Sequence, residues 1–239
     1  MTTASKETGS MTTLKTIAVL GATGMVGSRV IDEAGARGHR VLAMSRKPAS
    51  EGPNVMPLAV DANDTHALHE AFADAAAHGA APDAVVVAVR TFPADEEFLI
   101  GATRAVLDIA ARRGLRVLVV GGAGALRSPG DRGVLVADNP TYVPAEYRAV
   151  AAAGIAQLRA CQAHADADWV YLSPPALLEP GERTGRYRRG TDTLLTTAGG
   201  RSWISAEDLS VAAVDELENP GIEQHITVVH HDADPPGPA

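Results

Sequence analysis

The stretch that decides the fold is "IAVLGATGMVGSRVI", residues 17–31, which places three glycines directly behind an apolar run. Four apolar residues in a row, 17–20, are typical of a buried parallel strand. Apolar residues then recur at helical spacing from Met25 onward. The pattern therefore predicts a strand, a tight turn and a helix.

The three glycines, Gly21, Gly24 and Gly27, suit a turn that binds a dinucleotide. The first permits a sharp turn, the second lets the backbone approach a bound group, and the third lets the helix pack on the strand. Unpaired amides and the helix dipole both favour an anion at a helix N-terminus, so a pyrophosphate fits there. The spacing is GxxGxxG rather than GxGxxG, and an ordinary glycine-rich turn is the alternative interpretation.

Length and composition predict one domain. The chain has 239 residues, 46% of them hydrophobic, and no linker rich in Pro, Gly or Ser divides it. We expect a NAD(P)-binding Rossmann domain over residues 14–230, a disordered polar tail over 1–13 and a second tail over 231–239. Met11 is an alternative start to Met1.

Charge and cysteine content exclude several classes of function. A formal net charge of -8 without a basic cluster argues against nucleic-acid binding, which needs a concentrated positive face. The single cysteine, Cys161, excludes an internal disulfide and a cysteine zinc site, and we expect it to be buried in a helix. No apolar stretch approaches the ~20 residues that span a bilayer, and the first residues lack the apolar region of a signal peptide. We expect a cytoplasmic protein without metal or membrane partner.

Strands and helices alternate along the whole chain. The later apolar runs predict strands at 41–45, 54–60, 83–89, 116–122, 168–173 and 225–229. Helices are expected at 64–78, 96–113, 144–164 and 206–218, and short strands at 186–204. Continuous apolar runs are typical of a parallel sheet covered on both faces. We therefore expect an α/β fold with a doubly wound parallel sheet in the order 3-2-1-4-5-6-7, and a ligand crevice at the carboxyl ends of strands 1 and 4.

Four further segments carry a family resemblance: "VVGGAGAL" at 119–126, "PAEYRA" at 144–149, "DWVYLSPPALLEPGERTGRYRRG" at 168–190 and "SWISAEDLSVAAVDELENP" at 202–220. With the glycine turn, they make the chain resemble the atypical short-chain dehydrogenase/reductases. Within that group it is most similar to the NmrA-like NAD(P)H-binding proteins often called NADH-flavin reductases. The resemblance implies a nicotinamide cofactor, with substrate-side segments at about 126–147 and 174–205.

The resemblance also implies which residues contact the cofactor. Ser45-Arg46-Lys47 offers no carboxylate to the ribose hydroxyls of NAD, whereas the fork of Arg46 can bind a 2′-phosphate, which favours NADPH. The alternative is a solvated turn at Arg46 and Lys47. The expected cofactor contacts are Gly21, Thr23, Gly24, Met25, Val26, Gly27, Arg46, Asp61, Ala88, Val89, Arg90, Gly121, Gly122, Ser173 and Pro174.

Some of these positions allow other roles. Asp61 lies where similar proteins touch the adenine, but an N-cap or Asx-turn is also consistent. Ala88 and Val89 are small enough for the nicotinamide ribose to lie close. Arg90 departs from the small residue common in relatives, and it suits the pyrophosphate, an anionic substrate or a surface salt bridge.

The catalytic pair typical of the family is absent. Typical short-chain reductases use Tyr-x-x-x-Lys, in which the lysine lowers the pKa of the tyrosine and the tyrosine protonates the carbonyl oxygen. Here Tyr142 is followed four places on by Glu146, and Tyr147 by Ala151. Ala125 stands where close relatives commonly carry serine. Reduction of a simple ketone is therefore disfavoured.

A flavin, quinone or conjugated enone spreads the charge of an added hydride, so solvent can protonate it later. We therefore predict an NADPH-dependent reductase of a small, flat conjugated acceptor, with Tyr147, Tyr142 and Ser128 as candidate catalytic residues. Ser128 can serve only if its loop curls back, and the two tyrosines alternatively pack the helix start. An NAD(P)-sensing regulatory protein of NmrA type and a biosynthetic cyclase or isomerase are the competing interpretations.

Two features concern the substrate side and assembly. The Ser173-Pro174-Pro175 turn is a rigid loop that suits the wall of a pocket for a flat ring. Four arginines follow, and most are expected to be solvated while one or two attract an anionic ligand or an interface partner: Arg183, Arg186, Arg188 and Arg189. The helices at 96–113 and 144–164 each offer a surface for a homo-oligomer.

Overall fold

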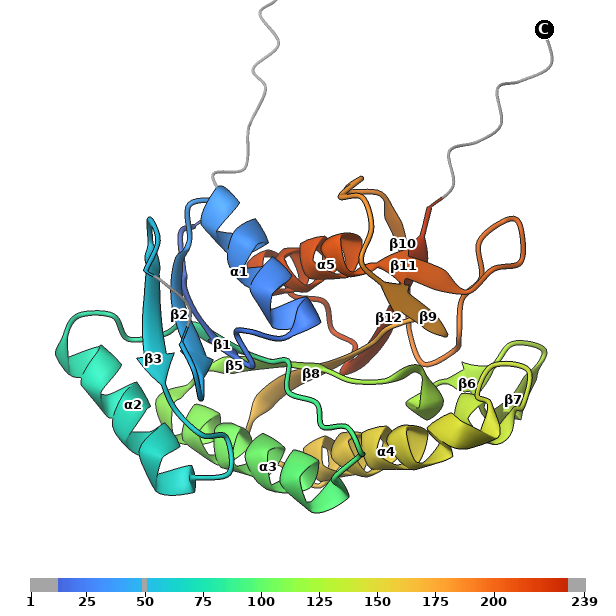
Figure 1. Cartoon of the computed structure of the whole chain (residues 1–239), viewed down its shortest axis with the longest axis horizontal. Helices are drawn as coiled ribbons and strands as arrows, with labels where there is room; N and C mark the ends of the chain where they lie inside the picture. The colour runs from blue at the N-terminus through green and yellow to red at the C-terminus, as the bar shows by residue number, and fades with distance from the viewer. Residues whose placement is uncertain (1–12, 49–50, 232–239) are drawn as a thin grey trace, which may run out of the picture.

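The computed structural model describes residues 13–48 and 51–231. Its centre is an eight-stranded sheet in the order β10-β12-β8-β5-β4-β1-β2-β3 (Figure 1). The strands are β1 (Thr16–Leu20), β2 (Arg40–Ser45), β3 (Val55–Ala59), β4 (Ala84–Val87), β5 (Arg116–Val120), β8 (Asp168–Ser173), β10 (Tyr187–Gly190) and β12 (His225–His230). All neighbours pair in parallel except β10, which is antiparallel to β12. The predicted strand order is confirmed, with β10 added at one edge.

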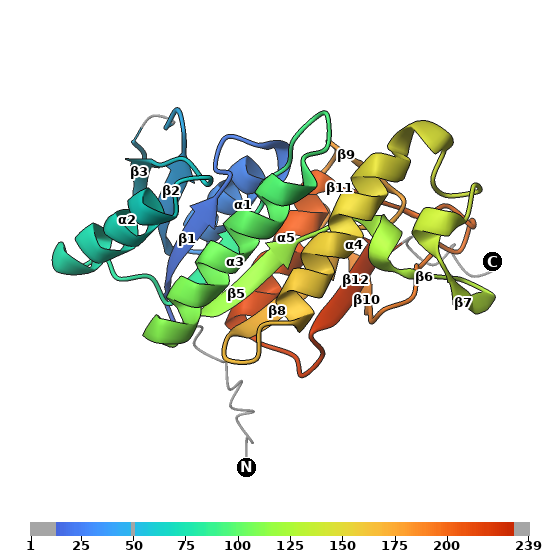
Figure 2. The same ribbon diagram turned by 90° about the horizontal axis from the view of Figure 1, so that it is seen from below.

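Helices cover both faces of this sheet, as Figures 1 and 2 show. One face carries α1 (Met25–Ala36) and α5 (Ala206–Glu218). The opposite face carries α2 (Thr65–Ala77), α3 (Glu96–Arg113) and α4 (Arg148–Gln162). This doubly wound arrangement is the Rossmann-like α/β fold that the sequence predicts.

The predicted helix ends follow from local chemistry. The Asp64 side chain caps α2 by accepting from the amide of Ala67, and the Asp95 side chain caps α3 by accepting from the amide of Phe98. Gly114 ends α3 in the left-handed conformation, with φ of 67°. A short 3-10 turn, η3 (Ala145–Tyr147), precedes α4, so the α-helix begins four residues later than the expected 144.

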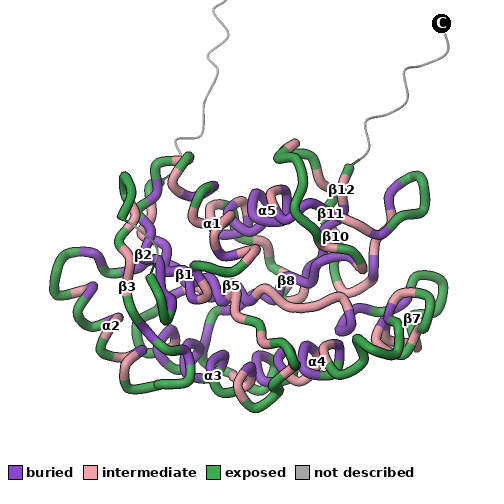
Figure 3. The backbone as a smooth tube through the Cα atoms, viewed as in Figure 1, coloured by how far each residue is buried: buried purple, intermediate pink, exposed green. Residues whose placement is uncertain are grey.

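The apolar core is split into two layers by the sheet, whose inner strands, such as β1 and β4, are buried along most of their length (Figure 3). In β1, Ala18 and Leu20 belong to one apolar cluster, and Ile17 and Val19 belong to the other. This burial on both faces explains why the strand is a continuous apolar run. Cys161 is buried in α4 as expected, and burial raises the pKa of its thiol to about 12.

Two small sheets and a third apolar cluster are built from segments that follow β5 and β8. After β5 come η1 (Ala123–Ala125), the antiparallel pair β6 (Arg127–Ser128) and β7 (Asp131–Leu135), and η2 (Val136–Asp138). After β8 come β9 (Leu177–Glu179) and its parallel partner β11 (Trp203–Ser205). Since parallel strands end at one edge, both sheets extend from the carboxyl edge of the main sheet.

The two predicted tails and the alternative start at Met11 fall almost wholly outside the described residues. Within the part of the chain that the structure describes, no helix has both the length and the apolar character needed to cross a membrane.

Candidate cofactor site

Two of the three glycines in the turn after β1 are required by the fold itself. Gly21 has a φ of +94°, and a Cβ built on it would lie 2.4 Å from the carbonyl oxygen of Ala88 at the end of β4. A Cβ on Gly27 would lie 2.2 Å from the carbonyl oxygen of Gly21. Only glycine permits these approaches, so β1, β4 and α1 meet in backbone contact.

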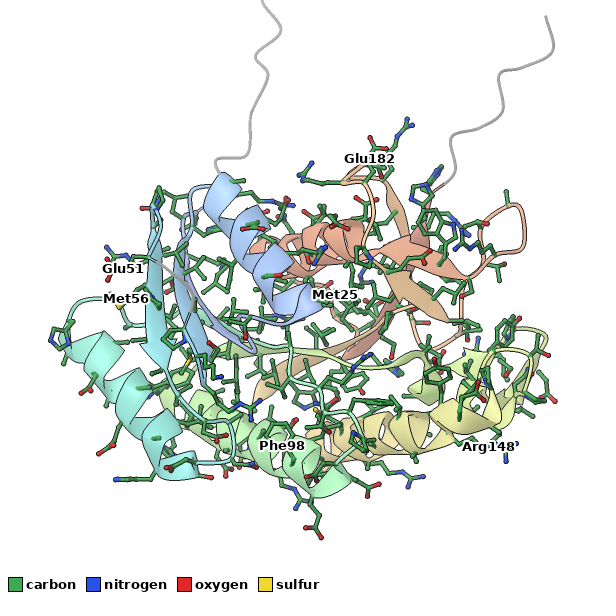
Figure 4. The ribbon with its side chains drawn as sticks, viewed as in Figure 1. Met25, Glu51, Met56, Phe98, Arg148 and Glu182 are labelled. Atoms are coloured by element: carbon green, nitrogen blue, oxygen red, sulfur yellow. The ribbon has the colours of Figure 1, made fainter. Side chains whose placement is uncertain are left out.

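Gly24 is different, because a Cβ there would make one tight contact rather than overlap with the backbone. It is exposed, its φ of -77° suits any residue, and the nearest atom to a built Cβ is the Gly21 carbonyl oxygen at 3.2 Å. Gly24 is the N-cap of α1 and has no side chain to cap the helix, and the first turn of α1 contains no acidic residue. The first amides of α1, from Met25 to Gly27, therefore lack a capping acceptor, and Met25 marks this end of the helix in Figure 4. Such a helix end fits a pyrophosphate.

The end of β2 carries unpaired polar groups. Ser45, its last residue, is buried, and its Oγ has no hydrogen-bond partner. Arg46 and Lys47 are exposed, and neither side chain has an acidic partner within the described residues. No carboxylate follows β2 in this segment. The two unpaired cations at this end of β2 can bind an anionic group of a ligand.

Asp61 forms an Asx-turn, which the sequence analysis gave as an alternative to a contact with the adenine. Its Oδ1 accepts from the amide of Asn63 at 3.0 Å. The residue is exposed beside β2, and a contact with the adenine stays a prediction.

At the end of β4, Ala88 and Val89 are half-buried and Arg90 is exposed. Arg90 finds no salt-bridge partner within residues 13–48 and 51–231, so that alternative is not supported.

At the end of β5, side-chain packing requires a glycine at Gly121 but not at Gly122. A Cβ on Gly121 would lie 2.0 Å from Cζ of Tyr171, so the ring of a neighbouring strand fills that space. Gly121 therefore serves the fold, a reason that the sequence analysis missed. A Cβ on Gly122 would meet no atom within 4 Å, which leaves its surface free.

Ser173 is fully buried, and its side chain holds the loop at Gly122. Its hydroxyl donates to the Gly122 carbonyl oxygen at 3.0 Å, and its Oγ lies 2.9 Å from Nε2 of His225. Burial lowers the pKa of His225, so its imidazole is neutral near pH 7. The Ser173 side chain thus supports the Gly122 loop, and its direct contact with the cofactor stays a prediction; Pro174 is buried next to it. Sequence reasoning missed His225 because only the fold brings it to Ser173.

The three candidate catalytic residues lie in different environments. Ser128 is 2% exposed, and its Oγ accepts from Nδ2 of Asn139 at 3.3 Å. The loop therefore does not present this hydroxyl to solvent, which argues against a catalytic role for Ser128. Tyr142 packs against the third apolar cluster, as the alternative interpretation held. Tyr147, at the start of α4, is 53% exposed and remains available to a ligand.

The arginine-rich segment is mostly used within the chain. Arg183 donates to both oxygens of Glu33 at 2.6 and 2.9 Å, and this contact lowers the pKa of Glu33. Arg189 pairs with Glu216 and Glu223, and Arg188 donates to the Thr196 carbonyl oxygen. A hollow of about 420 Å³ lies between this segment and α1, but the arginines that line it are already paired. These ion pairs leave little free charge for an anionic ligand in this region.

A model of the NAD(P)H-binding family matches residues 21–220. The chain belongs to this family. The match includes the glycine turn and both small sheets, and it confirms the resemblance to the NmrA-like, atypical short-chain reductases. A nicotinamide cofactor is therefore the expected ligand of the turn.

Relatives cover nearly the whole chain. The uncharacterized protein YwnB of Bacillus subtilis (strain 168) is 34% identical over 207 residues, which are 85% of this chain and 92% of YwnB. A provisionally named epimerase from Bacteroides thetaiotaomicron shares 30% identity with a TM-score of 0.80, over 93% of this chain and 100% of that one. A provisionally named NADH-flavin reductase from Streptococcus pneumoniae TIGR4 shares 26% identity with a TM-score of 0.76, over 90% of this chain and 99% of that one.

Proposed function

We propose that this protein is an NADPH-dependent reductase that delivers a hydride to a flat conjugated acceptor such as a flavin, a quinone or an enone. The observation that carries the proposal is the open N-terminus of α1 at Gly24, where the backbone amides lack a capping side chain. Membership of the NAD(P)H-binding family supports the same ligand at the same place. The relative named as an NADH-flavin reductase supports the reaction class.

The preference for NADPH is supported by the end of β2. Two groups there are free to meet a 2′-phosphate, the exposed cations of Arg46 and Lys47, and they follow the buried, unpaired hydroxyl of Ser45 in sequence. A guanidinium binds phosphate through two parallel hydrogen bonds, whereas a site for NAD uses a carboxylate at this place.

The kind of acceptor is inferred from the hydroxyl groups near the carboxyl edge of the sheet. Ser128 is buried, and Tyr147 has no lysine four residues later to act with it. When bound, NADPH supplies a hydride. The chain then needs only to hold a conjugated acceptor near the open surface of Gly122, because such an acceptor does not require a protein proton donor at the moment of transfer.

The test is the oxidation of NADPH, followed at 340 nm, by the purified full-length chain with a panel of flavins, quinones and enones. We expect turnover with at least one acceptor and a higher kcat/KM with NADPH than with NADH. Tight NADPH binding without turnover on the whole panel would contradict a reductase.

A sensor that binds the dinucleotide without consuming it is the second candidate. It is favoured by the missing Tyr-x-x-x-Lys pair and by the burial of Ser128. The same titration separates the two, because a sensor binds NADPH but leaves the absorbance at 340 nm unchanged with every acceptor. The relative named as an epimerase adds an isomerase as a third outcome, which would show turnover of a substrate without net loss of NADPH.

A further inference from the structure

The loop after β4 begins at the glycine turn and carries an unpaired arginine. The Ala88 carbonyl oxygen lies 2.4 Å from a Cβ built on Gly21, so the chain leaves β4 in direct contact with the turn. Arg90 follows two residues later and is exposed. Among the residues that the structure describes, none pairs with its guanidinium.

Many other arginines of the chain have an acidic partner, unlike Arg90. Eight of them form salt bridges with carboxylates: Arg29, Arg37, Arg116, Arg127, Arg132, Arg183, Arg189 and Arg201. Arg46 and Arg90 have no such partner within the described ranges. In the sheet, β1 lies between β2 and β4, so the strand ends that lead to Arg46 and Arg90 flank the glycine turn from opposite sides.

The anions of the cofactor have other partners. The pyrophosphate fits the open amides of α1, and a 2′-phosphate fits Arg46 and Lys47 at the end of β2. Arg90 follows the end of β4, which pairs with β1 on one side and with β5 on the other, and the space around Gly122 after β5 is open. Its charge is therefore available to a second ligand.

An exposed aromatic ring accompanies this charge. Phe92, two residues beyond Arg90, is 81% exposed. The loop that carries both is braced, because the Thr91 hydroxyl accepts from the amide of Asp95 at 2.7 Å and Asp95 in turn caps α3. A ring offers a face for a planar molecule, and a guanidinium offers a fork for a carboxylate, phosphate or sulfonate.

We propose that Arg90 and Phe92 form a recognition element for an acceptor that is both planar and anionic. Arg90 binds the anionic group of the acceptor, and the ring of Phe92 lies against its plane. This inference rests on the proposed reductase function and narrows its substrate class.

The test compares acceptors that share a ring system and differ in an anionic group. FMN is matched with riboflavin, and 1,4-naphthoquinone-2-sulfonate is matched with 1,4-naphthoquinone. The variants are Arg90→Gln, Arg90→Lys and Phe92→Ala, and the control is Arg104→Gln, which changes an exposed arginine on α3. The ratio of kcat/KM for the two members of a pair is compared between proteins, which removes intrinsic differences in reactivity.

We expect Arg90→Gln to lower kcat/KM at least tenfold for the anionic members, mainly through KM, and less than twofold for the neutral members. Arg90→Lys should recover part of the loss, Phe92→Ala should affect both members of each pair, and Arg104→Gln should affect neither. The affinity for NADPH should stay within twofold. Equal losses for both members, or a weaker NADPH affinity, would overturn the proposal.

A binding experiment keeps this result separate from the reductase proposal. Quenching of flavin fluorescence measures the affinity of the NADP⁺-loaded protein for FMN and riboflavin without turnover. A preference for FMN that disappears in Arg90→Gln supports the recognition element even if no acceptor is reduced. No preference, or one that Arg90→Gln leaves unchanged, overturns it.

Discussion

Two helices that lie side by side on one face of the sheet, α1 and α5, begin in opposite ways (Figure 1). The start of α5 is completed by the chain. Ser205 caps it by accepting from the amide of Asp208, and two acidic residues stand in its first turn. The start of α1 has neither a capping side chain nor an acidic residue.

The buried Asp208 shows what a completed helix start does for the fold. Its carboxylate accepts from the amides of Thr184 and Gly185, each at 2.8 Å, and from the Thr184 hydroxyl. It thereby attaches the segment before β10 to α5. Both helices have the same dipole, but in α5 the chain supplies the negative charge and in α1 it leaves that charge to a ligand. An uncapped helix start beside a capped one therefore indicates a place for a ligand.

The largest expected effect is on stability, at the capped start of α5. Asp208→Ala removes the buried acceptor of three hydrogen bonds from Thr184 and Gly185, so the free energy of unfolding should fall by about 3 kcal/mol or more. Urea unfolding measures this, and Asp32→Ala, which changes an exposed aspartate of α1, is the control. The NADPH affinity of the folded Asp208→Ala protein should be unchanged, and a matching loss of affinity would mean that the two helix ends are coupled.

The converse change adds a cap where the chain has none. Gly24→Asp lets a carboxylate accept from the Gly27 amide and repel a pyrophosphate, so the Kd for NADPH should rise about 100-fold or more. The φ of -77° suits aspartate, and the melting temperature measures the cost of the 3.2 Å contact between the added Cβ and the Gly21 carbonyl oxygen. Gly24→Asn is the neutral control and should weaken binding less. Equal losses in both variants would point to steric exclusion rather than charge. Gly21→Val tests the fold instead, since its Cβ would collide with Ala88.

Arg46→Ala sharpens the account of cofactor choice. Loss of a charge-assisted contact with a 2′-phosphate should weaken NADPH binding by about 1.5–3 kcal/mol and leave NADH binding nearly unaffected. Isothermal titration with both cofactors measures the two affinities in one protein. If both fell by the same factor, Arg46 would not distinguish NADPH from NADH.

The smallest effect is expected at Tyr147. Its exposed hydroxyl should orient the acceptor through one hydrogen bond, so Tyr147→Phe should lower kcat/KM by roughly twofold to tenfold. Steady-state kinetics with the best acceptor decides the magnitude. A loss beyond about 100-fold is typical of a general acid, and it would show that the protein does use a tyrosine as its proton donor.

Local chemistry made most of the fold predictable. The apolar run of β1, the cap at Asp64 and the glycine at 114 each act within a few residues, so the sequence alone indicated strands, helices and their order. The expected short strands at 186–204 include β10, but its antiparallel place beside β12 in the main sheet was harder to predict, because the two strands lie far apart in the sequence. It exists at a sheet edge, where its charges face solvent or carboxylates of other segments.

The site was only partly predictable for the same reason. The glycine turn is local, and its pattern indicated a dinucleotide. The role of Gly121 depends on a ring fifty residues later, and the burial of Ser128 depends on a hairpin and on Asn139. Neither contact leaves a signal in a short stretch of sequence. The location of the protein and its oligomeric state stay predictions.

NMR tests directly whether the open start of α1 binds the cofactor. NADPH is titrated into the ¹⁵N-labelled full-length chain while the backbone amide resonances are followed. The account predicts that the amides of Met25, Val26 and Gly27 shift in proportion to occupancy, while those of Asp208 and its neighbours at the start of α5 do not. Shifts at α5 without shifts at α1, or saturation without any change at Met25–Gly27, would contradict it.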